Sequence, residues 1–374
     1  MDGTVYVLRP GEGDLALRGL GRAERAVLST LSAQPVGLPS LLAALERRRE
    51  RLEPSALVEL LSKLEAAGVV LAGEADAEPP SPRHARQEPY LAALGLSQRD
   101  LRDATVAVLG CGGLGTWALA SLAGLGVGRL VLADDDAIEP SNLNRQVLYG
   151  AQDVGARKVD CAARWVQAFD PDLHVVAHPL RVRGPVDAAL LVDGADALVL
   201  AADWPPYELA RWVNTACQAA RVPFITAGQV PPLLRVGPCY IPGRTACFAC
   251  HETHLRAGAP LYDELVRRRR AAAHEPAVTL APSSGVIGTL VAMEVLHLLA
   301  GGEPPATAGR ALLIDMRTLE TRWEAVPADP SCPACEHPAD ERERTTDHDP
   351  RPGRRTPDAP PDPPGPQRAG GEPA

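Results

Sequence analysis

The segment between residues 105 and 125 constrains the fold of this chain more than any other feature of its sequence. The apolar run T-V-A-V-L at 105–109 has the length and β-branched content of a buried strand, and G-C-G-G-L-G at 110–115 follows it directly. Glycines at this point let the backbone turn tightly and approach phosphate oxygens, whose charge suits the N-terminus of the helix that begins here. We therefore predict a nucleotide-binding turn formed by Gly110, Gly112, Gly113 and Gly115.

Candidate strands and helices alternate through the region that follows. Further strand-like runs lie at 129–133, 174–177, 197–201 and 223–227, and segments with helical spacing separate them. This alternation is typical of a doubly wound α/β domain, in which helices cover both faces of a Rossmann-like sheet. We assign this domain to residues 105–338 and expect it to carry out the chemistry of the protein.

An acidic residue stands where a nucleotide-binding fold needs one. Asp134 follows the second candidate strand, about 20 residues beyond the glycine turn, which is the usual place of the acid that binds the ribose hydroxyls. Nicotinamide and flavin proteins share both features. A dehydrogenase is therefore a fair alternative at this point.

The next segment favours an enzyme that cleaves a nucleoside triphosphate. D-D-D-A-I-E-P-S-N-L-N-R-Q at 134–146 contains two of the three asparagines of the chain, and Lys158 follows twelve residues later. Only two of the 38 basic residues are lysines, so a lysine here indicates that a compact ammonium group is needed. Arginine and lysine can neutralise the charge of a departing pyrophosphate, whereas hydride transfer needs no such cluster. A solvated loop with a stray lysine is the structural alternative.

Two cysteine pairs predict a metal site. C-F-A-C at 247–250 and C-P-A-C at 332–335 together offer four thiolates, which suit tetrahedral Zn²⁺ and leave no open position. We therefore predict a structural zinc ion held by Cys247, Cys250, Cys332 and Cys335. The string C-F-A-C-H is also a haem attachment signal, but that use requires export, and the N-terminus has no apolar signal core.

The other four cysteines are expected to be buried thiols. Cys111 lies inside the glycine turn and Cys161 on a predicted helix, where a small apolar side chain is sufficient. For Cys217 and Cys239 the alternative is a nucleophile in a thioester step.

Residues 1–73 are predicted to form a separate small α/β unit. The predicted order is strand 4–9, strand 14–20, helix 23–31, helix 39–49, helix 55–67 and strand 69–71. Three helices closed by a strand resemble a winged helix. The third helix carries Glu59 and Glu65 against a single Lys63, which would repel DNA phosphates. We therefore expect this unit to dock a peptide, or to be purely structural, rather than to bind DNA.

Charge and apolar content exclude several classes of protein. A net charge of −9 argues against general nucleic-acid binding. No run of 18 uncharged apolar residues is present, so we expect a cytoplasmic protein that makes no contact with a membrane.

Residues 72–82 are predicted to form a polar, proline-rich linker. Residues 339–374 read as a disordered tail, because no Leu, Ile, Val, Met or aromatic residue follows Cys335.

The motifs between Arg83 and Cys335 resemble those of the ubiquitin-activating-type adenylating superfamily, which includes the ThiF, MoeB and HesA enzymes. The shared patterns are G-C-G-G-L-G, D-x-D-x-I-E-x-S-N-L-x-R-Q-V-L, G-x-x-K and V-G-P-x-Y-I-P-G-R-T-x-C-x-x-C. Most sulfur-carrier enzymes of the superfamily have two aspartates in a D-x-x-D-N segment. This chain has one, in A-D-W-P at 202–205, as does the MccB-like branch that adenylates the microcin C precursor peptide.

The resemblance implies how the nucleotide is held. Gly113 would approach it, Asp134 would hold the ribose, and Asp203 would hold Mg²⁺ between phosphate oxygens. The remaining contacts to ATP would come from Asp136, Asn142, Arg145, Gln146 and Lys158.

The resemblance also implies a second subunit. Arg86, in R-H-A-R-Q at 83–87 of the linker segment 74–104, matches an arginine that reaches into the partner subunit's active site. We therefore expect a homodimer, with a solvated linker arginine as the alternative. The candidate catalytic residues are Arg86, Arg145, Lys158 and Asp203.

The expected activity is that of an ATP-dependent adenylyltransferase. The C-terminal carboxylate, or a terminal amide, of a ribosomally made peptide or small protein would attack the α-phosphorus of MgATP and release pyrophosphate. Activation of a ubiquitin-like sulfur carrier is one alternative, and a non-catalytic subunit that docks a peptide is another.

The sequence leaves the roles of two segments undecided. The four arginines at 267–270 form a solvated loop or steer an anionic peptide terminus, and the apolar helix 284–299 belongs to the core or to a subunit interface.

Overall fold

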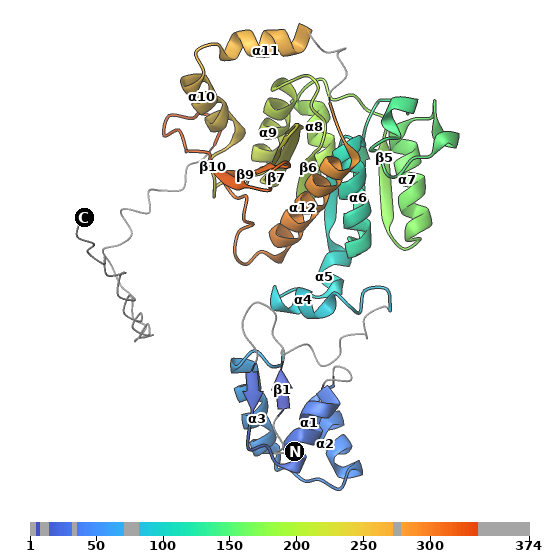
Figure 1. The fold of residues 1–374 in the computed structure, drawn as a ribbon, viewed down its shortest axis with the longest axis vertical. Coiled ribbons are helices and arrows are strands. Elements are labelled where there is room, and N and C mark those ends of the chain that lie inside the picture. The colour runs from blue at the N-terminus through green and yellow to red at the C-terminus, as the bar shows by residue number, and fades with distance from the viewer. Residues whose placement is uncertain (1–4, 8–14, 32–35, 71–81, 272–277, 336–374) are drawn as a thin grey trace, which may run out of the picture. The chain divides into compact units, whose positions relative to one another are not determined.

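The computed structural model describes residues 5–7, 15–31, 36–70, 82–271 and 278–335 (Figure 1). The predicted tail at 339–374 and nearly all of the predicted linker at 72–82 lie outside the described residues. Within the described ranges, a small N-terminal unit and a larger α/β domain each have a hydrophobic core of their own.

The larger domain is built on one eight-stranded sheet in the order β10-β9-β8-β7-β6-β3-β4-β5. Its strands are β3 Thr105–Leu109, β4 Arg129–Ala133, β5 His174–His178, β6 Ala197–Leu200, β7 Phe224–Val230, β8 Leu233–Tyr240, β9 Arg310–Asp315 and β10 Thr321–Ala325. Strands β3 to β7 are parallel and confirm the five predicted strands. Strands β8, β9 and β10 add an antiparallel extension that the sequence analysis did not predict, so the sheet is mixed.

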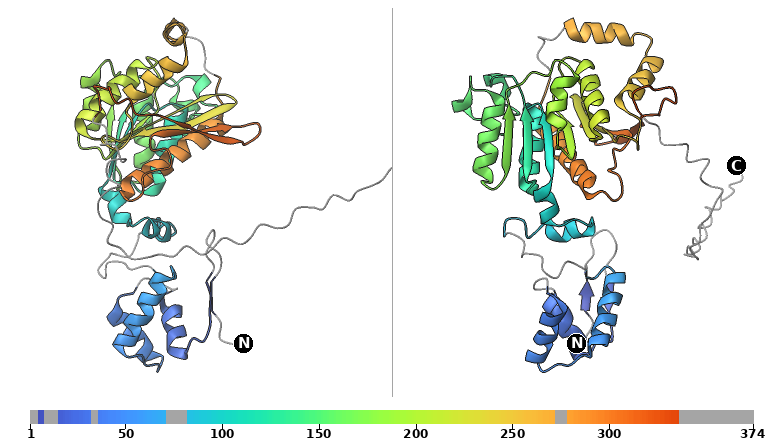
Figure 2. Two further views of the ribbon diagram at one scale, coloured as in Figure 1. Left: turned by 90° about the vertical axis from the view of Figure 1, so that its left-hand side faces the viewer. Right: turned by 180° about the vertical axis from the view of Figure 1, so that it is seen from behind.

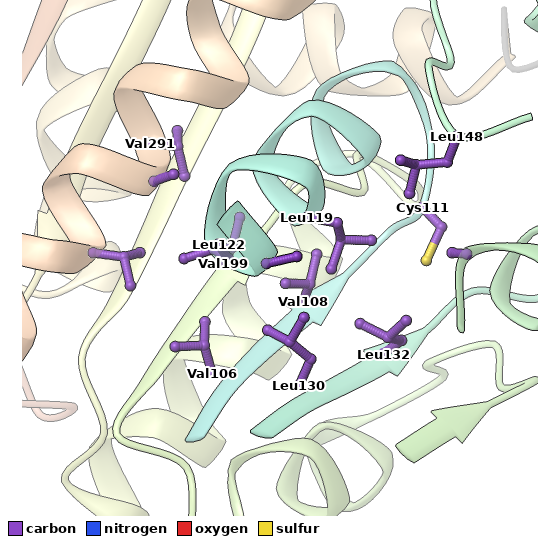
Figure 3. Close-up of a cluster of buried hydrophobic side chains, with 14 of the residues drawn as sticks. Val106, Val108, Cys111, Leu119, Leu122, Leu130, Leu132, Leu148, Val199 and Val291 are labelled. Atoms are coloured by element: carbon purple, nitrogen blue, oxygen red, sulfur yellow. The ribbon is translucent and has the colours of Figure 1, made fainter. Parts of the chain in front are cut away.

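Helices cover both faces of this sheet, as expected for a doubly wound domain (Figure 2). One face is covered by α6 Gly113–Leu125, α7 Lys158–Phe169 and α12 Ala281–Ala300, and the other by α8 Pro185–Val192 and α9 Glu208–Ala220. Val106 and Val108 of β3 pack against the first group (Figure 3), and Ala107 and Leu109 pack against the second. Because both faces are buried, β3 is an unbroken apolar run rather than an alternating one.

The apolar helix predicted over 284–299 is α12, and it is a core element of the domain. Val291 and Val295 are fully buried, and Gly288 lies against α6 so closely that a Cβ atom would stand 2.6 Å from Trp117 Cβ. Of the described helices, α12 alone is long and apolar enough to cross a membrane. Half of its most apolar stretch is buried inside the protein, which explains the apolar composition.

Four further helices connect these layers: α4 Glu88–Ala93, α5 Gln98–Asp103, α10 Phe248–Gly258 and α11 Tyr262–Ala271. Leu91 of α4 and Leu101 of α5 pack against Leu296 of α12, so these two helices share its hydrophobic contacts. Two short 3₁₀ turns, Pro140–Asn142 and Ala151–Asp153, lie between β4 and α7.

The arginine run at 267–270 lies on α11, so the loop alternative for this segment is wrong.

The N-terminal unit has the two predicted strands and the three predicted helices. Its elements are β1 Val5–Val7, β2 Leu15–Leu17, α1 Arg22–Leu31, α2 Leu38–Arg47 and α3 Pro54–Ala66. The strands pair antiparallel, and the helices enclose a core that includes Val27, Leu41 and Leu57. The strand predicted over 69–71 is wrong for residues 69 and 70, which form a bend, and residue 71 lies outside the described residues. Two apolar residues after a glycine do not make a strand without a partner to supply its hydrogen bonds.

Candidate nucleotide site and cysteine cluster

The glycine turn lies at the point where the strand order of the sheet reverses. From β3 the chain continues to β4 on one side, whereas β6 and β7 lie on the other side. The carboxyl ends of these parallel strands meet at one edge, which is where open α/β sheets bind ligands. Gly110 has a φ of +103°, and a Cβ atom there would stand 2.6 Å from the backbone nitrogen of Ala202. A Cβ atom at Gly115 would stand 1.9 Å from the Gly110 carbonyl oxygen. Only glycine at both positions permits this turn.

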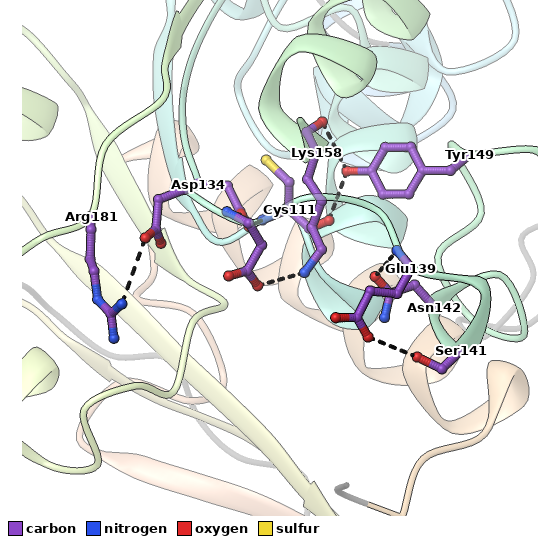
Figure 4. Close-up of polar contacts among 10 residues, drawn as sticks. Cys111, Asp134, Glu139, Ser141, Asn142, Tyr149, Lys158 and Arg181 are labelled. Carbon is purple, nitrogen blue, oxygen red and sulfur yellow. Dashed lines mark hydrogen bonds and ion pairs between the residues drawn. The ribbon is translucent and has the colours of Figure 1, made fainter. Parts of the chain in front are cut away.

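The predicted ribose acid is in contact with the glycine turn (Figure 4). Asp134 Oδ2 accepts a hydrogen bond of 2.6 Å from the backbone N–H of Cys111, and Oδ1 accepts one of 2.8 Å from that of Asp136. Burial raises the pKa of Asp134, and the two backbone donors oppose that rise. The carboxylate therefore holds the glycine turn and the loop after β4 together.

Lys158 stands at the start of α7 with its side chain 9% exposed. Its ammonium group lies 2.6 Å from Asp136 Oδ2, and the Asp136 side chain is 65% exposed (Figure 4). The buried cation is thus neutralised by a carboxylate that faces solvent. A buried, paired ammonium beside a glycine turn is not a stray surface lysine, so the structural alternative for Lys158 is wrong.

The segment between β4 and α7 also brings Asn142, Arg145 and Gln146 to this edge. Asn142 is buried, and its Oδ1 accepts a hydrogen bond of 3.1 Å from the backbone N–H of Glu139. Arg145 donates to the Ser141 carbonyl at 3.0 Å. Its Cδ atom lies 3.2 Å from the position that a Cβ atom of Gly113 would take. Gln146 is 2% exposed, and within the described part of the chain its Oε1 has no hydrogen-bond partner.

Two polar residues near Gly113 were missed by the sequence analysis. Ser284, at the start of α12, places its Oγ 3.0 Å from the position of a Gly113 Cβ atom. Gln229 of β7 donates to that Oγ at 3.2 Å, and its own Oε1 is buried without a partner among the described residues. The only sequence signal was the place of Ser284 at the start of the apolar segment 284–299, which we assigned to the core or to a subunit interface.

Asp203 lies at the same sheet edge as the glycine turn. It follows β6 in the turn that contains Ala202, whose backbone touches Gly110, and its side chain is exposed. The sheet order therefore brings together the predicted glycines, Asp134, Lys158 and Asp203, which are far apart in the sequence.

Arg86 does not lie with the other predicted residues. It is exposed in the turn before α4, and the neighbouring Gln87 donates to the carbonyl of Leu125, the last residue of α6, at 2.8 Å. The glycine turn is at the opposite end of α6, and 13 residues at about 1.5 Å each make this helix about 20 Å long. Figure 1 shows α4 and α5 at the far end of α6. The fold of one chain thus keeps Arg86 away from its own glycine turn.

The four paired cysteines form one cluster, as predicted. Their Sγ atoms all lie within 4.8 Å of one another, with Cys247 to Cys332 at 3.8 Å and Cys250 to Cys335 at 3.5 Å. Four sulfurs at about 2.3 Å from a central Zn²⁺ stand about 3.8 Å apart, so the cluster has the dimensions of a tetrahedral thiolate site. All four cysteines are free thiols, which is the form that can take up a metal.

We expect the purified protein to contain about one zinc ion per chain. Cys332→Ser should lose the zinc and lower the melting temperature, because binding of a structural metal stabilises the folded state. Metal analysis and thermal melting of the two proteins test this. Cys217→Ala is the matched control, since it removes a buried thiol outside the cluster and should retain the metal. Unchanged zinc content in Cys332→Ser would refute the site.

The other cysteines are buried as expected. Cys217 and Cys239 are fully buried, and burial raises the pKa of Cys217 to about 12 and that of Cys239 well above its usual value. A thiol with a raised pKa is not ionised near neutral pH and is a poor nucleophile. The structure therefore favours buried thiols over the thioester alternative.

Three of the four arginines of α11 are paired with acids. Arg267 and Arg268 lie 2.7 Å and 2.8 Å from Glu264, and Arg270 lies 2.6 Å from Glu208 of α9. The first two contacts lie within α11, and the Arg270–Glu208 pair attaches α11 to the start of α9, a few residues after Asp203. The alternative that these arginines steer an anionic peptide terminus stays a hypothesis.

Comparison with known proteins identifies the family. The model of the ThiF family matches residues 84–336, about two thirds of the chain. The chain belongs to the ThiF family. It is 35% identical over 243 residues to the sulfur carrier protein ThiS adenylyltransferase of Escherichia coli K12, which covers 64% of this chain and 88% of that protein. It is 33% identical over 240 residues to the molybdopterin-synthase adenylyltransferase of Salmonella typhimurium LT2, with 64% and 89% covered.

Solved structures resemble a longer part of this ThiF-family chain. The structure of E. coli MccB with MccA-N7isoASN is 26% identical, has a TM-score of 0.67, and covers 89% of this chain and 98% of that one. The microcin C7 biosynthetic enzyme MccB in complex with N-formylated MccA gives the same values. The chain is accordingly an adenylyltransferase of the ThiF family, and ATP is the nucleotide that the family implies.

Proposed function

We propose that this ThiF-family adenylyltransferase activates the C-terminal carboxylate, or a terminal amide, of a ribosomally made peptide. A carboxylate oxygen attacks the α-phosphorus of ATP, the bond from that phosphorus to the bridging oxygen breaks, and pyrophosphate leaves with the electron pair. The product is an acyl-adenylate. The observation that carries this proposal is the meeting of the glycine turn, Arg145 and the buried Lys158 at one edge of the sheet.

Each of these groups has a task in that reaction. The backbone N–H groups at the start of α6 suit phosphate oxygens, and Asp134 suits the ribose hydroxyls. Lys158 and Arg145 would neutralise the charge that develops on the leaving pyrophosphate. The Asp136 side chain is 65% exposed. Water can therefore solvate its carboxylate when the Lys158 ammonium pairs with phosphate instead of with Asp136. Asp136, Asn142 and Gln146 would complete the walls of the nucleotide site.

Asp203 is the residue proposed to hold Mg²⁺. An exposed carboxylate next to a phosphate site is the kind of ligand that Mg²⁺ takes, with phosphate oxygens and water as the others. The ion would neutralise phosphate charge when bound.

The extent of the structural likeness supports a peptide substrate. The sulfur-carrier relatives cover 64% of this chain, whereas the MccB structures cover 89% and therefore include part of the N-terminal unit. The single aspartate of A-D-W-P points to the same branch. We propose residues 1–73 as a peptide-docking unit of winged-helix type, 74–104 as a linker with the arginine finger, and 105–338 as the adenylation domain. The tail at 339–374 lies outside the described residues.

A ubiquitin-like sulfur carrier is the second candidate substrate. Its support is the identity of 35% and 33% to enzymes named for ThiS and molybdopterin synthase. The same carboxylate chemistry would serve both substrates, so only the recognition of the partner differs.

We also propose a homodimer in which each active site receives Arg86 from the other subunit. The support is the position of Arg86, exposed and about one length of α6 away from its own glycine turn. One more cation beside the leaving pyrophosphate would act as an arginine finger.

The substrate is tested by ATP–pyrophosphate exchange with the full chain. A short peptide encoded beside this gene should support exchange, and its isolated C-terminal fragment should do so with a KM at least about tenfold higher and a similar kcat. Docking of the remote part of a peptide adds binding in both ground and transition states, which lowers KM alone. Exchange with a sulfur carrier and not with the peptide would establish the second candidate. Equal KM values for the peptide and its fragment would remove the docking role, and no exchange with either substrate would overturn the function.

A further inference from the structure

A chain of hydrogen bonds joins the glycine turn to the start of α7 (Figure 4). Cys111 N–H donates to Asp134 Oδ2 at 2.6 Å, and Asp136 N–H donates to Asp134 Oδ1 at 2.8 Å. Lys158 then donates twice to Asp136, from its backbone N–H to the carbonyl at 2.9 Å and from Nζ to Oδ2 at 2.6 Å. These contacts connect three segments that are well separated in the sequence.

Tyr149 closes this chain into a ring. Its hydroxyl oxygen lies 2.8 Å from the carbonyl oxygen of Cys111 and 3.1 Å from that of Lys158. A hydroxyl group has one hydrogen to donate, so the two carbonyls share it. Tyr149 is 8% exposed, and burial raises its pKa, so the hydroxyl keeps its hydrogen at any working pH.

The ring has one side chain that the proposed reaction does not use. Asp134, Asp136 and Lys158 are all proposed to face the nucleotide, whereas the Tyr149 hydroxyl is directed at two backbone carbonyls. One of these belongs to the glycine turn, whose amides would bind phosphate. The other belongs to the residue whose ammonium would bind the leaving group.

We propose that Tyr149 is a positioning residue, whose hydroxyl holds the glycine turn and Lys158 at the spacing that the transition state requires. This inference rests on the proposed adenylation. Tyr149 touches no substrate, and it acts through the two carbonyl groups. Losing the hydroxyl leaves the phenyl ring packed in the core but frees the turn and α7 to shift relative to each other.

The expected effect falls on the chemical step. ATP can still bind through its ribose and through the amides of the glycine turn, which the substitution does not remove. Stabilisation of the departing pyrophosphate depends on the exact place of the Lys158 ammonium, and misplacement by about 1 Å can cost about 100-fold in rate. A partial shift should therefore lower kcat by about tenfold and leave the KM for ATP within about threefold.

Tyr149→Phe tests this, with Tyr262→Phe as the matched control. Tyr262 is also buried, and its hydroxyl donates to Glu252 Oε1 at 3.0 Å, away from the glycine turn. Both variants lose one buried hydroxyl hydrogen bond, so their melting temperatures should fall by similar amounts. Only Tyr149→Phe should lose kcat in pyrophosphate exchange. An equal kcat in the two variants, or a loss confined to KM, would overturn the proposal.

A second measurement does not depend on activity. Hydrogen–deuterium exchange of the peptides that contain residues 110–116 and 157–163 should quicken together in Tyr149→Phe and stay unchanged in Tyr262→Phe. Unchanged exchange in both segments of Tyr149→Phe would mean that the hydroxyl does not join them. Absence of pyrophosphate exchange in the wild-type chain would instead count against adenylation, so the two failures are distinguishable.

Discussion

Lys158→Ala and Arg145→Ala are each expected to lower ATP–pyrophosphate exchange by at least about 100-fold. In a shielded site, a charged group placed where charge develops contributes several kcal/mol to the transition state, and each 1.4 kcal/mol is about tenfold in rate. The Lys158 side chain is 9% exposed, so solvent screens its charge little, and a water molecule in its place would carry no positive charge. The loss should appear in kcat more than in the KM for ATP.

The fold should survive both substitutions. Lys158→Ala leaves Asp136 without its ion-pair partner, but this carboxylate is 65% exposed and is solvated by water. Lys63→Ala is the matched control, because Lys63 is the only other lysine of the chain and its side chain is 72% exposed. It should retain normal exchange. Near-normal exchange in both Lys158→Ala and Arg145→Ala would disprove the nucleotide site as we describe it.

A mixture of two inactive proteins is expected to regain activity. Arg86→Ala and Asp203→Ala should each be inactive alone. In a mixed dimer, one active site combines the intact Asp203 of the first subunit with the intact Arg86 of the second, and both lesions fall in the other site. Random exchange makes about half of the dimers mixed, each with one good site, so activity should return to at most about a quarter of wild type.

A second mixture serves as the control. Lys158→Ala and Asp203→Ala both alter residues at the same sheet edge of one chain. Each site of their mixed dimer carries one lesion, so no activity should return. If subunits are seen to exchange and the Arg86→Ala mixture stays inactive, Arg86 acts within its own chain or has no catalytic role.

The parallel half of the sheet could be predicted because its signals are local. A strand buried on both faces is an apolar run, and the turn after β3 tolerates only glycine at two positions, whatever the rest of the chain does. The antiparallel half could not be predicted in this way. The β8 segment is interrupted by Gly237 and Pro238, and it pairs with β9, which lies about 70 residues later. The strand prediction was wrong at residues 69 and 70, because adjacent apolar residues form a strand only where a neighbouring strand supplies the hydrogen bonds.

The sequence by itself determined the kind of chemistry available at each strand end. Glycines after β3, an acid after β4, a rare lysine and two cysteine pairs were all evident from residue type and spacing. Only the tertiary structure decided which of them meet. It assembled the four sulfurs within 4.8 Å, paired Lys158 with Asp136, added Ser284 and Gln229 beside Gly113, and kept Arg86 at the far end of α6. The reason is physical. Residue patterns act on the backbone over a few residues, whereas side chains distant in sequence meet only through strand order and helix packing.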